Sequence, residues 1–469
     1  MMWRPSNGLT RTTALLQDPI LPIRGERQVH GNVSFNPEYV LRAAREAGRA
    51  GKGLAFAHSH PGGAGWQALN SGDELAESRI ANVAREVTGL PLIGLTLAGD
   101  GAWSARHWSG TGRGVRPLGC ESVRVIGDGL RVTFDDSLVA VPRLAETQVR
   151  TVHTWGEKTH AMIARLRVAV AGVGSVGMSI ADVLARTGIQ RLGVFEFDTV
   201  EIVNIDRLRS ASALDAHLLR PKTHVARRLL EEGSTAAESS HEVHELSICE
   251  PEGFRRLLDF DLVFSCVDRP WPRHVLNTIA FADLIPVVEG GLSAFQNRNL
   301  SLRNAYWSST VVRPGRPCLA CLGQYDPAVV QVERDGSLDD PSYIANLPAD
   351  SPLRRRENVA ALSTMVTAAL LQQFVAFVAR PSGFSDPGPL RFNLRDHTVE
   401  RVTAVCDPEC PYAISGSTGD ARLDPSARHL RAEEARTHRA DVPLGIRVAR
   451  SLDDVIRGLQ RRVRHLLSC

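Results

Sequence analysis

The stretch LRVAVAGVGSVGMSIADVLARTGIQRLGVFEFDTVEIVNIDR, residues 166–207, decides the fold. Residues 166–171 are almost wholly apolar, which predicts a strand buried on both faces, as in parallel sheets. A glycine-rich turn follows, then a helical segment over about 178–186 and a second apolar strand over 191–197. Parallel strands need crossover connections, so this pattern predicts an α/β protein with a doubly wound, mostly parallel sheet.

The turn between strand and helix reads G-x-G-x-x-G, with Gly172, Gly174 and Gly177. Glycines at these positions let backbone N–H groups approach a phosphate at the N-terminus of the helix. Glu196 follows about 20 residues later, where an acid can hydrogen-bond a ribose hydroxyl. The pattern alone is also compatible with a tight strand–helix turn that binds no ligand.

Polar residues after the second strand favour a nucleoside triphosphate. Asp198 and Asn204 are followed by two cations, Arg207 and Lys222. Cations are needed there because the phosphates of a triphosphate must be neutralised during adenylyl transfer. A further apolar run, 261–267, ends at Asp268, and an acid at the carboxyl end of a strand is well placed to hold Mg²⁺.

These residues together resemble the ThiF/MoeB/ubiquitin-E1 adenylyltransferase superfamily over about residues 145–410. The shared pattern adds Arg273 and Asn277, which follow Asp268. The resemblance implies that Glu196 binds the ribose and that Asp268 is the acid linked to Mg²⁺. It also implies that the ATP phosphates are contacted by Asn204, Arg207 and Lys222. The family usually has Asp at the position of Glu196, so the ribose contact is expected to be shifted by one methylene.

Residues 1–115 predict a separate, smaller α/β unit. We expect a strand at 20–23, a helix over 37–50 and a buried strand over 53–57, which runs into His58 and His60. Two histidines at i and i+2 at a strand end point to the same side, and Asp73 supplies an oxygen. Two His and one carboxylate with an open position are typical of a catalytic zinc site. The alternative is an incidental pair of histidines in a glycine-rich loop.

The stretch HSHPGGAGWQALNSGD, residues 58–73, resembles the JAB/MPN (JAMM) metalloprotease domain. The resemblance implies His58, His60 and Asp73 as metal ligands. The family's serine is replaced by Asn70, with Ser71 beside it, and either side chain can hydrogen-bond an oxyanion. The upstream general-base glutamate of the family has no clear counterpart, because Glu26 lies in what should be a later strand.

Two cysteine pairs predict a structural zinc site in the second half of the chain. Each C-x₂₋₃-C pair can place two thiolates on one tetrahedral Zn²⁺, and four thiolates close its coordination shell. The four residues are Cys318, Cys321, Cys406 and Cys410. E1-like proteins commonly carry such a zinc knot here, whereas the alternative is four unrelated buried cysteines.

No cysteine occurs in residues 323–357, where thioester-forming relatives carry one. The other cysteines, at 120, 249, 266 and 469, lack the exposed, electropositive setting of a reactive thiol. We therefore expect adenylation without an in-chain thioester, and transfer to an E2-like or sulfur-transfer partner.

The composition is that of a globular protein. A net charge of +3 over 469 residues gives no case for nucleic acid or membrane as a partner. Sparse cysteines favour the cytoplasm, and the apolar segment 363–378 is read as a core helix. We expect four parts: a JAB/MPN-like domain (1–115), a strand-rich connection (116–150), an adenylation domain (151–410), and a linker with an Arg-rich C-terminal helix (411–469).

The function that these patterns favour is ATP-dependent adenylation of the C-terminal carboxylate of a ubiquitin-like protein or peptide. The JAB-like domain would process or deconjugate the same modifier. Family resemblance further implies a homodimer, with Arg150 as the nearest candidate to reach the partner's ATP, although a solvated surface arginine is the favoured interpretation of Arg150. Two alternatives remain: a non-catalytic scaffold for a ubiquitin-like tail, and an NAD-dependent oxidoreductase, which leaves Asn204, Arg207, Lys222 and the cysteine pairs unexplained.

Overall fold

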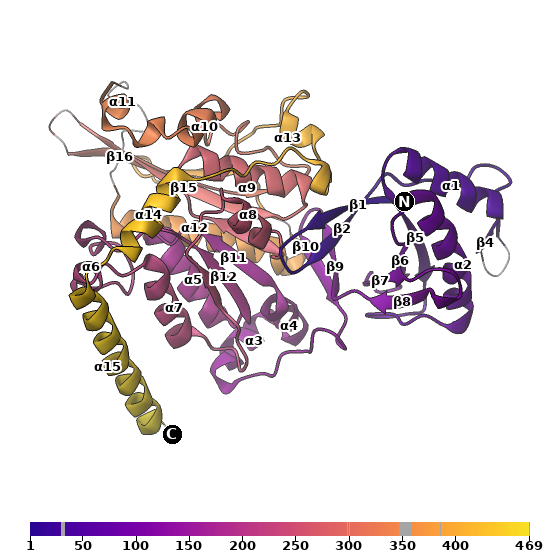
Figure 1. Ribbon diagram of the computed structural model, residues 1–469, viewed down its shortest axis with the longest axis horizontal. Coiled ribbons are helices and arrows are strands. Elements are labelled where there is room, and N and C mark those ends of the chain that lie inside the picture. The colour runs from indigo at the N-terminus through magenta and orange to yellow at the C-terminus, as the bar shows by residue number, and fades with distance from the viewer. Residues whose placement is uncertain (30–32, 298, 300, 347–357, 385, 469) are drawn as a thin grey trace.

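The computed structural model describes residues 1–29, 33–297, 299, 301–346, 358–384 and 386–468. Two large sheets dominate the described part of the chain. One belongs to the N-terminal quarter and the other to the body of the protein, and Figure 1 shows the two units side by side, with a strand hairpin between them.

The body is built on an eight-stranded mixed sheet. In order across the sheet, its strands are β13 (Glu242–His244), β12 (Arg191–Phe195), β11 (Arg167–Ala171), β14 (Leu262–Ser265), β15 (Val287–Gln296), β16 (Leu302–Val312), β17 (Leu390–Asn393) and β18 (Thr398–Arg401). The first five run parallel, with β11 at their centre. The doubly wound α/β arrangement expected from residues 166–207 is therefore confirmed for this half of the sheet.

The other half of the sheet differs from the expected, mostly parallel arrangement. Strands β15, β16, β17 and β18 are joined antiparallel. Strand β15 begins only at Val287, because Leu284 has a left-handed φ of 52° and Pro286 precedes the first strand residue. The strand then continues to Gln296, as one arm of a long hairpin with β16.

Helices cover both faces of the body's sheet. Along β11, Val168 and Val170 pack on one face, whereas Ala169 and Ala171 pack on the other. The first face is covered by α5 (Ser175–Thr187), α7 (Lys222–Gly233) and α12 (Ala360–Val378), and the second by α8 (Pro251–Leu257) and α9 (Pro270–Ala282). The remaining helices of this region are α3 (Val149–Trp155), α4 (Glu157–Arg165), α6 (Ala213–His217), α10 (Pro327–Arg334), α11 (Pro341–Asn346) and α13 (Pro411–Ile414).

Helix α12 is long and apolar enough to cross a membrane by length and composition, and half of its apolar window is buried inside the protein. It packs against α5, β15 and β16. Val366, Leu370, Phe374 and Phe377 belong to the main hydrophobic core. This packing confirms the interpretation of residues 363–378 as a core helix.

The N-terminal unit contains a six-stranded sheet. Its strands, in order, are β2 (Thr12–Gln17), β1 (Met2–Asn7), β5 (Gly53–His60), β6 (Ile93–Ala98), β7 (Trp103–Ser109) and β8 (Arg116–Gly119). Helices α1 (Pro37–Arg49) and α2 (Ser71–Thr88) pack together through buried alanines. A small hairpin is formed by β3 (Arg27–Val29) and β4 (Val33–Phe35). The strand expected at 20–23 is wrong: this segment is irregular and contains Pro22, which has no N–H to donate to a sheet.

The two units are joined by polar contacts between the start of the chain and the body. Ser6 donates to Asp283 at 2.7 Å, and Arg11 donates to the buried carboxylate of Asp261 at 2.6 Å. Arg124, in the hairpin of β9 (Ser122–Ile126) and β10 (Leu130–Phe134), lies 3.4 Å from the same carboxylate. The N-terminal hairpin therefore docks on the sheet of the body.

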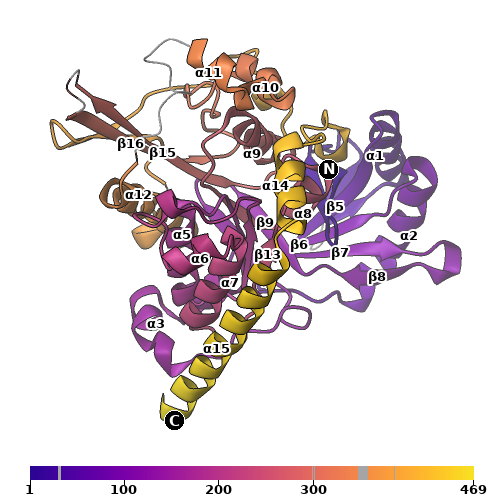
Figure 2. The same cartoon turned by 60° about the vertical axis from the view of Figure 1, so that its left-hand side comes forward.

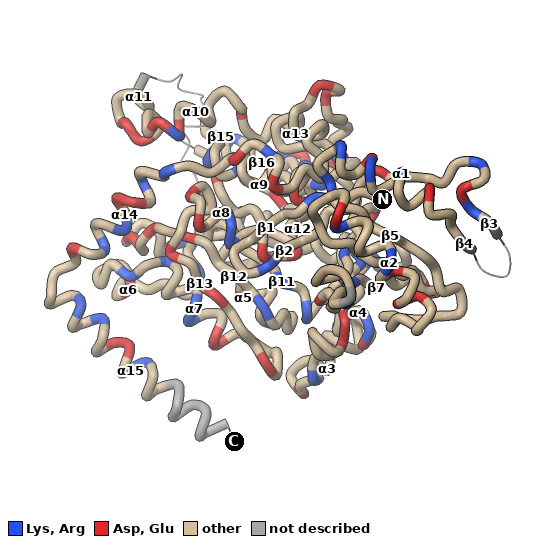
Figure 3. The backbone as a smooth tube through the Cα atoms, turned by 45° about the vertical axis from the view of Figure 1, so that its right-hand side comes forward, with Lys and Arg blue, Asp and Glu red and all other residues tan. Residues whose placement is uncertain are grey.

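Helices α14 (Leu430–Ala440) and α15 (Leu444–Ser468) end the chain. Figure 2 shows α14 running over the body next to α8, with α15 continuing beyond it. Basic residues recur along both helices (Figure 3). The segment expected as a linker thus contains a further helix, α14, ahead of the Arg-rich helix.

Candidate functional site: a nucleotide-binding edge and two metal-ligand clusters

The glycine-rich turn connects β11 to α5. Gly172 adopts a left-handed φ of 84°, a conformation that favours glycine. A Cβ on Gly177 would lie 1.9 Å from the carbonyl oxygen of Gly172, so only glycine permits this close packing. Gly174 is different, because nothing lies within 4 Å of the place where its Cβ would be. The turn is therefore closed on its inner side and open at the N-terminus of α5, as an anion site requires.

Glu196 directly follows β12 and binds the glycine-rich turn. Its Oε2 accepts a hydrogen bond from the N–H of Val173 at 3.2 Å. Its Oε1 accepts from the N–H groups of Phe197 and Asp198, at 2.9 and 3.1 Å. The acid predicted to bind ribose thus lies beside the turn, held in one orientation by three amides.

Asp198 and Lys222 form an ion pair at the carboxyl edge of the sheet. The Nζ of Lys222, the first residue of α7, lies 3.0 Å from Oδ2 of Asp198. Burial alone would lower the pKa of Lys222, but the carboxylates of Glu196 and Asp198 raise it above its ordinary value. Burial likewise opposes ionisation of Asp198, whereas Lys222 and Arg431 lower its pKa. Lys222 is therefore a partly buried cation at neutral pH.

Asn204 and Arg207 lie on the connection between β12 and α6, around a 3₁₀ turn (Ile202–Asn204). The Oδ1 of Asn204 accepts from the N–H of Glu201 at 3.1 Å. Arg207 donates to the carbonyl of Val203 and to Asp206, at 2.7 and 2.8 Å. Among the described residues, no hydrogen bond or ion pair joins either side chain to Lys222 or Asp198.

Asp268 lies in the loop between β14 and α9, and it is exposed. The negative charge of Asp268 contributes to raising the pKa values of both Glu333 and Arg431. Arg273 and Asn277, on α9, both contact other protein groups. Arg273 lies 3.2 Å from the buried Glu289, while Asn277 accepts from the N–H of Leu319 at 3.0 Å and thereby fixes the first cysteine pair.

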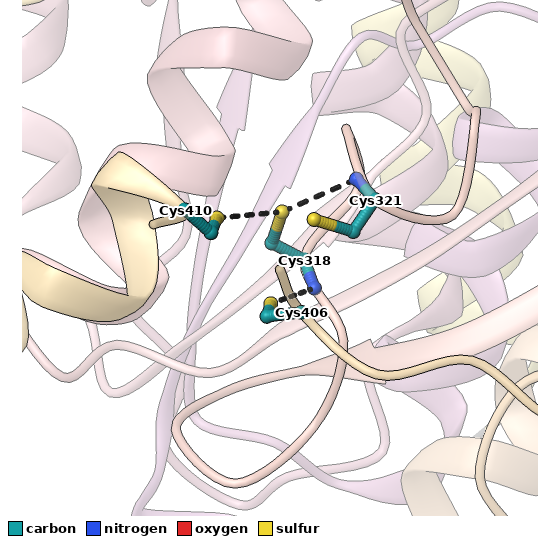
Figure 4. Close-up of side chains that lie close together, drawn as sticks. All are labelled: Cys318, Cys321, Cys406 and Cys410. Atoms are coloured by element: carbon teal, nitrogen blue, oxygen red, sulfur yellow. Dashed lines mark hydrogen bonds between the residues drawn. The ribbon is translucent and has the colours of Figure 1, made fainter. Parts of the chain in front are cut away.

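The four predicted zinc-binding cysteines come together although two segments far apart in the sequence supply them (Figure 4). All four Sγ atoms lie within 4.8 Å of one another, and those of Cys318 and Cys410 are 3.6 Å apart. A tetrahedral zinc with bonds of about 2.3 Å separates its sulfur ligands by about 3.8 Å. The N–H groups of Cys318 and Cys321 also point at cluster sulfurs, which stabilises thiolates. The cluster therefore fits Zn²⁺.

A second ligand cluster lies at the end of β5. The Nε2 atoms of His58 and His60 are 3.2 Å apart, and Oδ2 of Asp73 lies 3.6 and 3.1 Å from them. Ligands on a tetrahedral zinc with bonds of about 2.0–2.1 Å are about 3.3 Å apart, so this donor set also fits the metal. Asn70 is the N-cap of α2 and donates to Oδ2 of Asp73 at 2.6 Å, so it orients the ligand.

Two acids of the N-terminal unit, Glu26 and Glu77, have defined partners. Glu26 accepts hydrogen bonds from Arg42 and from the N–H of Ile23. Glu77 is fully buried on α2 and lies 3.7 Å from Nδ1 of His58, but it is paired with Arg106. Sequence patterns did not single out Glu77. It could have been identified as a charged residue at a position of α2 that faces the core.

The cysteines outside the cluster are poorly suited to nucleophilic attack. Burial raises the pKa of Cys120 to about 11 and holds the pKa values of Cys249 and Cys266 above the ordinary range. Thiols with raised pKa values are neutral at physiological pH and react slowly. Cys469 lies outside the described residues.

Comparison with known proteins adds to this geometry. A model of the ThiF family matches residues 146–411, more than half of the chain. The chain belongs to the ThiF family. The match contains the glycine-rich turn, the Asp198–Lys222 pair and the four cysteines, but it does not include the N-terminal unit or the last two helices.

Several curated proteins are similar to this ThiF-family chain. Ubiquitin-like modifier-activating enzyme 5 of Drosophila melanogaster is 26% identical over 283 residues, covering 54% of this chain and 59% of that protein. Molybdopterin-synthase adenylyltransferase of Escherichia coli K12 is 28% identical over 158 residues, which covers 34% of this chain and 59% of that one. The chain thus spans about three fifths of the length of these relatives.

Solved structures of MccB of E. coli are also similar to part of the chain. One, of MccB with selenomethionine MccA, has a TM-score of 0.43 at 16% identity and covers 57% of this chain and 74% of that one. The two chains thus share this likeness at low sequence identity.

One residue at the carboxyl edge of the sheet, beside the Asp198–Lys222 pair, has no counterpart in the sequence motifs. Arg431, on α14, lies 3.4 Å from Oδ1 of Asp198, on the side of the carboxylate opposite Lys222. It lies outside the segment matched by the ThiF family. Sequence separation of 233 residues hides this contact, because no local pattern links the two positions.

Proposed function

We propose that this chain activates a carboxylate by adenylyl transfer from ATP, and that the carboxylate is the C-terminus of a ubiquitin-like protein or peptide. The observation that carries the proposal is the placement of the Asp198–Lys222 pair beside an open glycine-rich turn, inside the ThiF-matched segment. This edge offers backbone N–H groups and a cation to a triphosphate.

In the proposed reaction, a carboxylate oxygen of the substrate attacks the α-phosphorus of ATP. The bond between the α-phosphorus and the bridging oxygen breaks, and pyrophosphate leaves with the electron pair. Negative charge develops on the leaving group, so Lys222 acts by neutralising it. Arg207 is assigned the same task. Its guanidinium must then give up its hydrogen bonds to Asp206 and to the carbonyl of Val203 and form hydrogen bonds to phosphate instead.

The other residues of the edge hold the reactants. The N–H groups at the start of α5 bind phosphate, Glu196 binds the ribose hydroxyls, and Asn204 contacts the phosphates. Asp268 is exposed and free to bind a hydrated cation, and Mg²⁺ bound there would supply charge neutralisation to the phosphates. The reaction is then mostly positioning and electrostatic stabilisation.

The adenylate product would pass to a separate E2-like or sulfur-transfer partner. This part of the proposal is supported by the absence of cysteine from residues 323–357, by the burial of Cys249 and by the raised pKa of Cys266, which is partly buried. Relatives named for ubiquitin-like modifier activation and for molybdopterin-synthase adenylylation support the class of substrate.

For the N-terminal unit, we propose a JAB/MPN-like domain that binds a divalent metal through His58, His60 and Asp73 and recognises the same modifier. The mutual distances of the three ligand atoms support metal binding. Binding without peptide hydrolysis is favoured because the upstream general-base glutamate has no clear counterpart, and Glu26, which precedes His58 in the sequence, already accepts hydrogen bonds from Arg42 and a backbone amide.

The experiment that tests the adenylation proposal is ATP–pyrophosphate exchange. Labelled pyrophosphate should enter ATP only when a ubiquitin-like protein ending in glycine is present. ATP binding without exchange, over a panel of such proteins, would favour the scaffold function instead.

A further inference from the structure

Helix α14 lies across the proposed nucleotide-binding edge, which comprises the glycine-rich turn, Glu196, Asp198 and Lys222. Arginines of α14 fix the helix there. Arg439 donates to the carbonyl of Phe197 and pairs with Glu245 at 3.1 Å. Arg436 donates to Glu250. Figure 2 shows α14 against the body beside α8. The C-terminal part of the chain is therefore attached to the residues that follow β12 and β13.

The segment before α14 is packed between two aromatic residues of the same edge. The ring of His429 lies 5.2 Å from that of Phe197 and 5.0 Å from that of Trp271. The indole N–H of Trp271 donates to the carbonyl of Pro425 at 2.9 Å. Phe197 follows β12 and Trp271 lies in the first turn of α9, so His429 bridges the two connections that bear Asp198 and Asp268.

This packing directs Arg431 toward the edge. Its guanidinium lies over the ring of Phe197, 5.4 Å from the centroid, and 3.4 Å from Oδ1 of Asp198. Burial lowers the pKa of Arg431, but Asp198, Asp339, Asp268 and Glu196 together raise it above its ordinary value. The guanidinium thus contacts Asp198, and its charge interacts favourably with Glu196 and Asp268, the acids to which the ribose and Mg²⁺ are assigned above.

The contacts of Arg431 leave it free to bind a further anion. A guanidinium has five N–H donors, and a charge-assisted hydrogen bond is usually about 2.7–2.9 Å long. Among the described residues, the contact with Asp198 is the one ion pair of Arg431, and at 3.4 Å it is long. Lys222 already neutralises the other oxygen of the same carboxylate.

We propose that Arg431 is a nucleotide-binding residue: the C-terminal helix α14 completes the site, and the guanidinium binds the phosphates of ATP. The inference rests on the proposed function and adds to it a cation from outside the ThiF-matched segment. When the triphosphate is bound, Arg431 exchanges its long contact with Asp198 for phosphate oxygens, while the packing of His429 on Phe197 and Trp271 keeps the start of α14 in place.

The test is a titration of the full-length protein with ATP·Mg²⁺, and separately with adenosine, followed by calorimetry. Removing a charge-assisted contact should weaken ATP binding by about tenfold to a hundredfold in Arg431→Ala. Adenosine binding should be unchanged, because it carries no phosphate, and Arg431→Lys should recover part of the ATP affinity. Arg428→Ala is the matched control, since Arg428 is exposed and pairs with Glu433.

Each other outcome overturns the inference in a recognisable way. Equal ATP affinity in wild type and Arg431→Ala, with Lys222→Ala weakened, would leave the proposed function standing and show that Arg431 only stabilises α14. Tighter ATP binding in Arg431→Ala would show that α14 blocks the site. A wild-type protein that does not bind ATP would overturn the proposed function as well. Thermal unfolding of each variant establishes that it is folded.

Discussion

Glu77 and Arg106 form a buried ion pair next to His58. The Nε of Arg106 donates to Oε2 of Glu77 at 2.8 Å, and the indole N–H of Trp108 donates to the same oxygen at 2.9 Å. Glu77 is fully buried and Arg106 is 6% exposed. One buried acid thus connects α2 to β7 behind the His cluster.

Replacing Glu77 should strongly destabilise the N-terminal unit. Glu77→Ala leaves the Arg106 charge buried without a partner, which costs about 3–5 kcal/mol in comparable pairs. Urea unfolding followed by tryptophan fluorescence measures this loss. Glu74→Ala, at an exposed position of the same helix, should change the free energy of unfolding by about 0.5 kcal/mol or less. Equal stability of the two variants would contradict the assigned role of Glu77.

The His cluster should bind a divalent metal ion. His60→Ala removes one of three converging ligand atoms, so it should lower the metal content of protein purified with zinc by one ion per chain. His153→Ala, at an exposed position on α3, should retain the wild-type content. Elemental analysis gives the stoichiometry. Unchanged zinc content in His60→Ala would show that these three residues do not form a metal site.

The four-cysteine cluster should stabilise the body of the protein through zinc. Cys406→Ser or prolonged chelation should lower the melting temperature, because a structural zinc contributes folding free energy directly. Cys120→Ser is the matched control, since Cys120 lies outside the cluster. Differential scanning calorimetry with and without a chelator measures the effect. A melting temperature that neither change lowers would exclude a structural role for metal here.

The pH dependence of stability should contain a contribution from Glu333. Burial raises the pKa of Glu333 to about 7, although the N–H of Trp271, 2.7 Å away, and Arg269 act in the opposite direction. The folded state therefore prefers the protonated acid. The resulting stabilisation is fully present below about pH 4.5 and is lost as the pH rises through about 7.

Glu333→Gln should remove this dependence while keeping an acceptor for Trp271. Between pH 5 and 8, the free energy of unfolding of the wild type should fall relative to the variant by on the order of 2–3 kcal/mol. Urea unfolding at a series of pH values gives the difference. Parallel curves for the two proteins would mean that Glu333 titrates near its ordinary pKa.

The sequence was sufficient to predict the centre of the fold. Residues 166–207 predict β11, α5 and β12 to within a few residues, because a strand buried on both faces has an apolar signature that does not depend on distant partners. The antiparallel strands β16, β17 and β18 were missed. Their edges are partly exposed, and β18 is exposed throughout, so their patterns carry little apolar signal.

The candidate site could be predicted only where its residues occur in one short segment or in a spaced motif. His58, His60 and Asp73 are close in sequence, and the cysteine pairs can be recognised by their C-x₂₋₃-C spacing. Arg431 could not be found in this way, because its contact with Asp198 is created by the docking of α14 far along the chain.

The exchange of pyrophosphate into ATP tests the central claim most directly. The assay compares wild type with Lys222→Ala and with Lys158→Ala, whose lysine is exposed on α4. Removing a cation from the developing charge should slow carboxylate-dependent exchange by on the order of a hundredfold in Lys222→Ala, and Lys158→Ala should match the wild type. Exchange that proceeds equally fast in all three proteins would contradict the assignment of this edge as the site of adenylyl transfer.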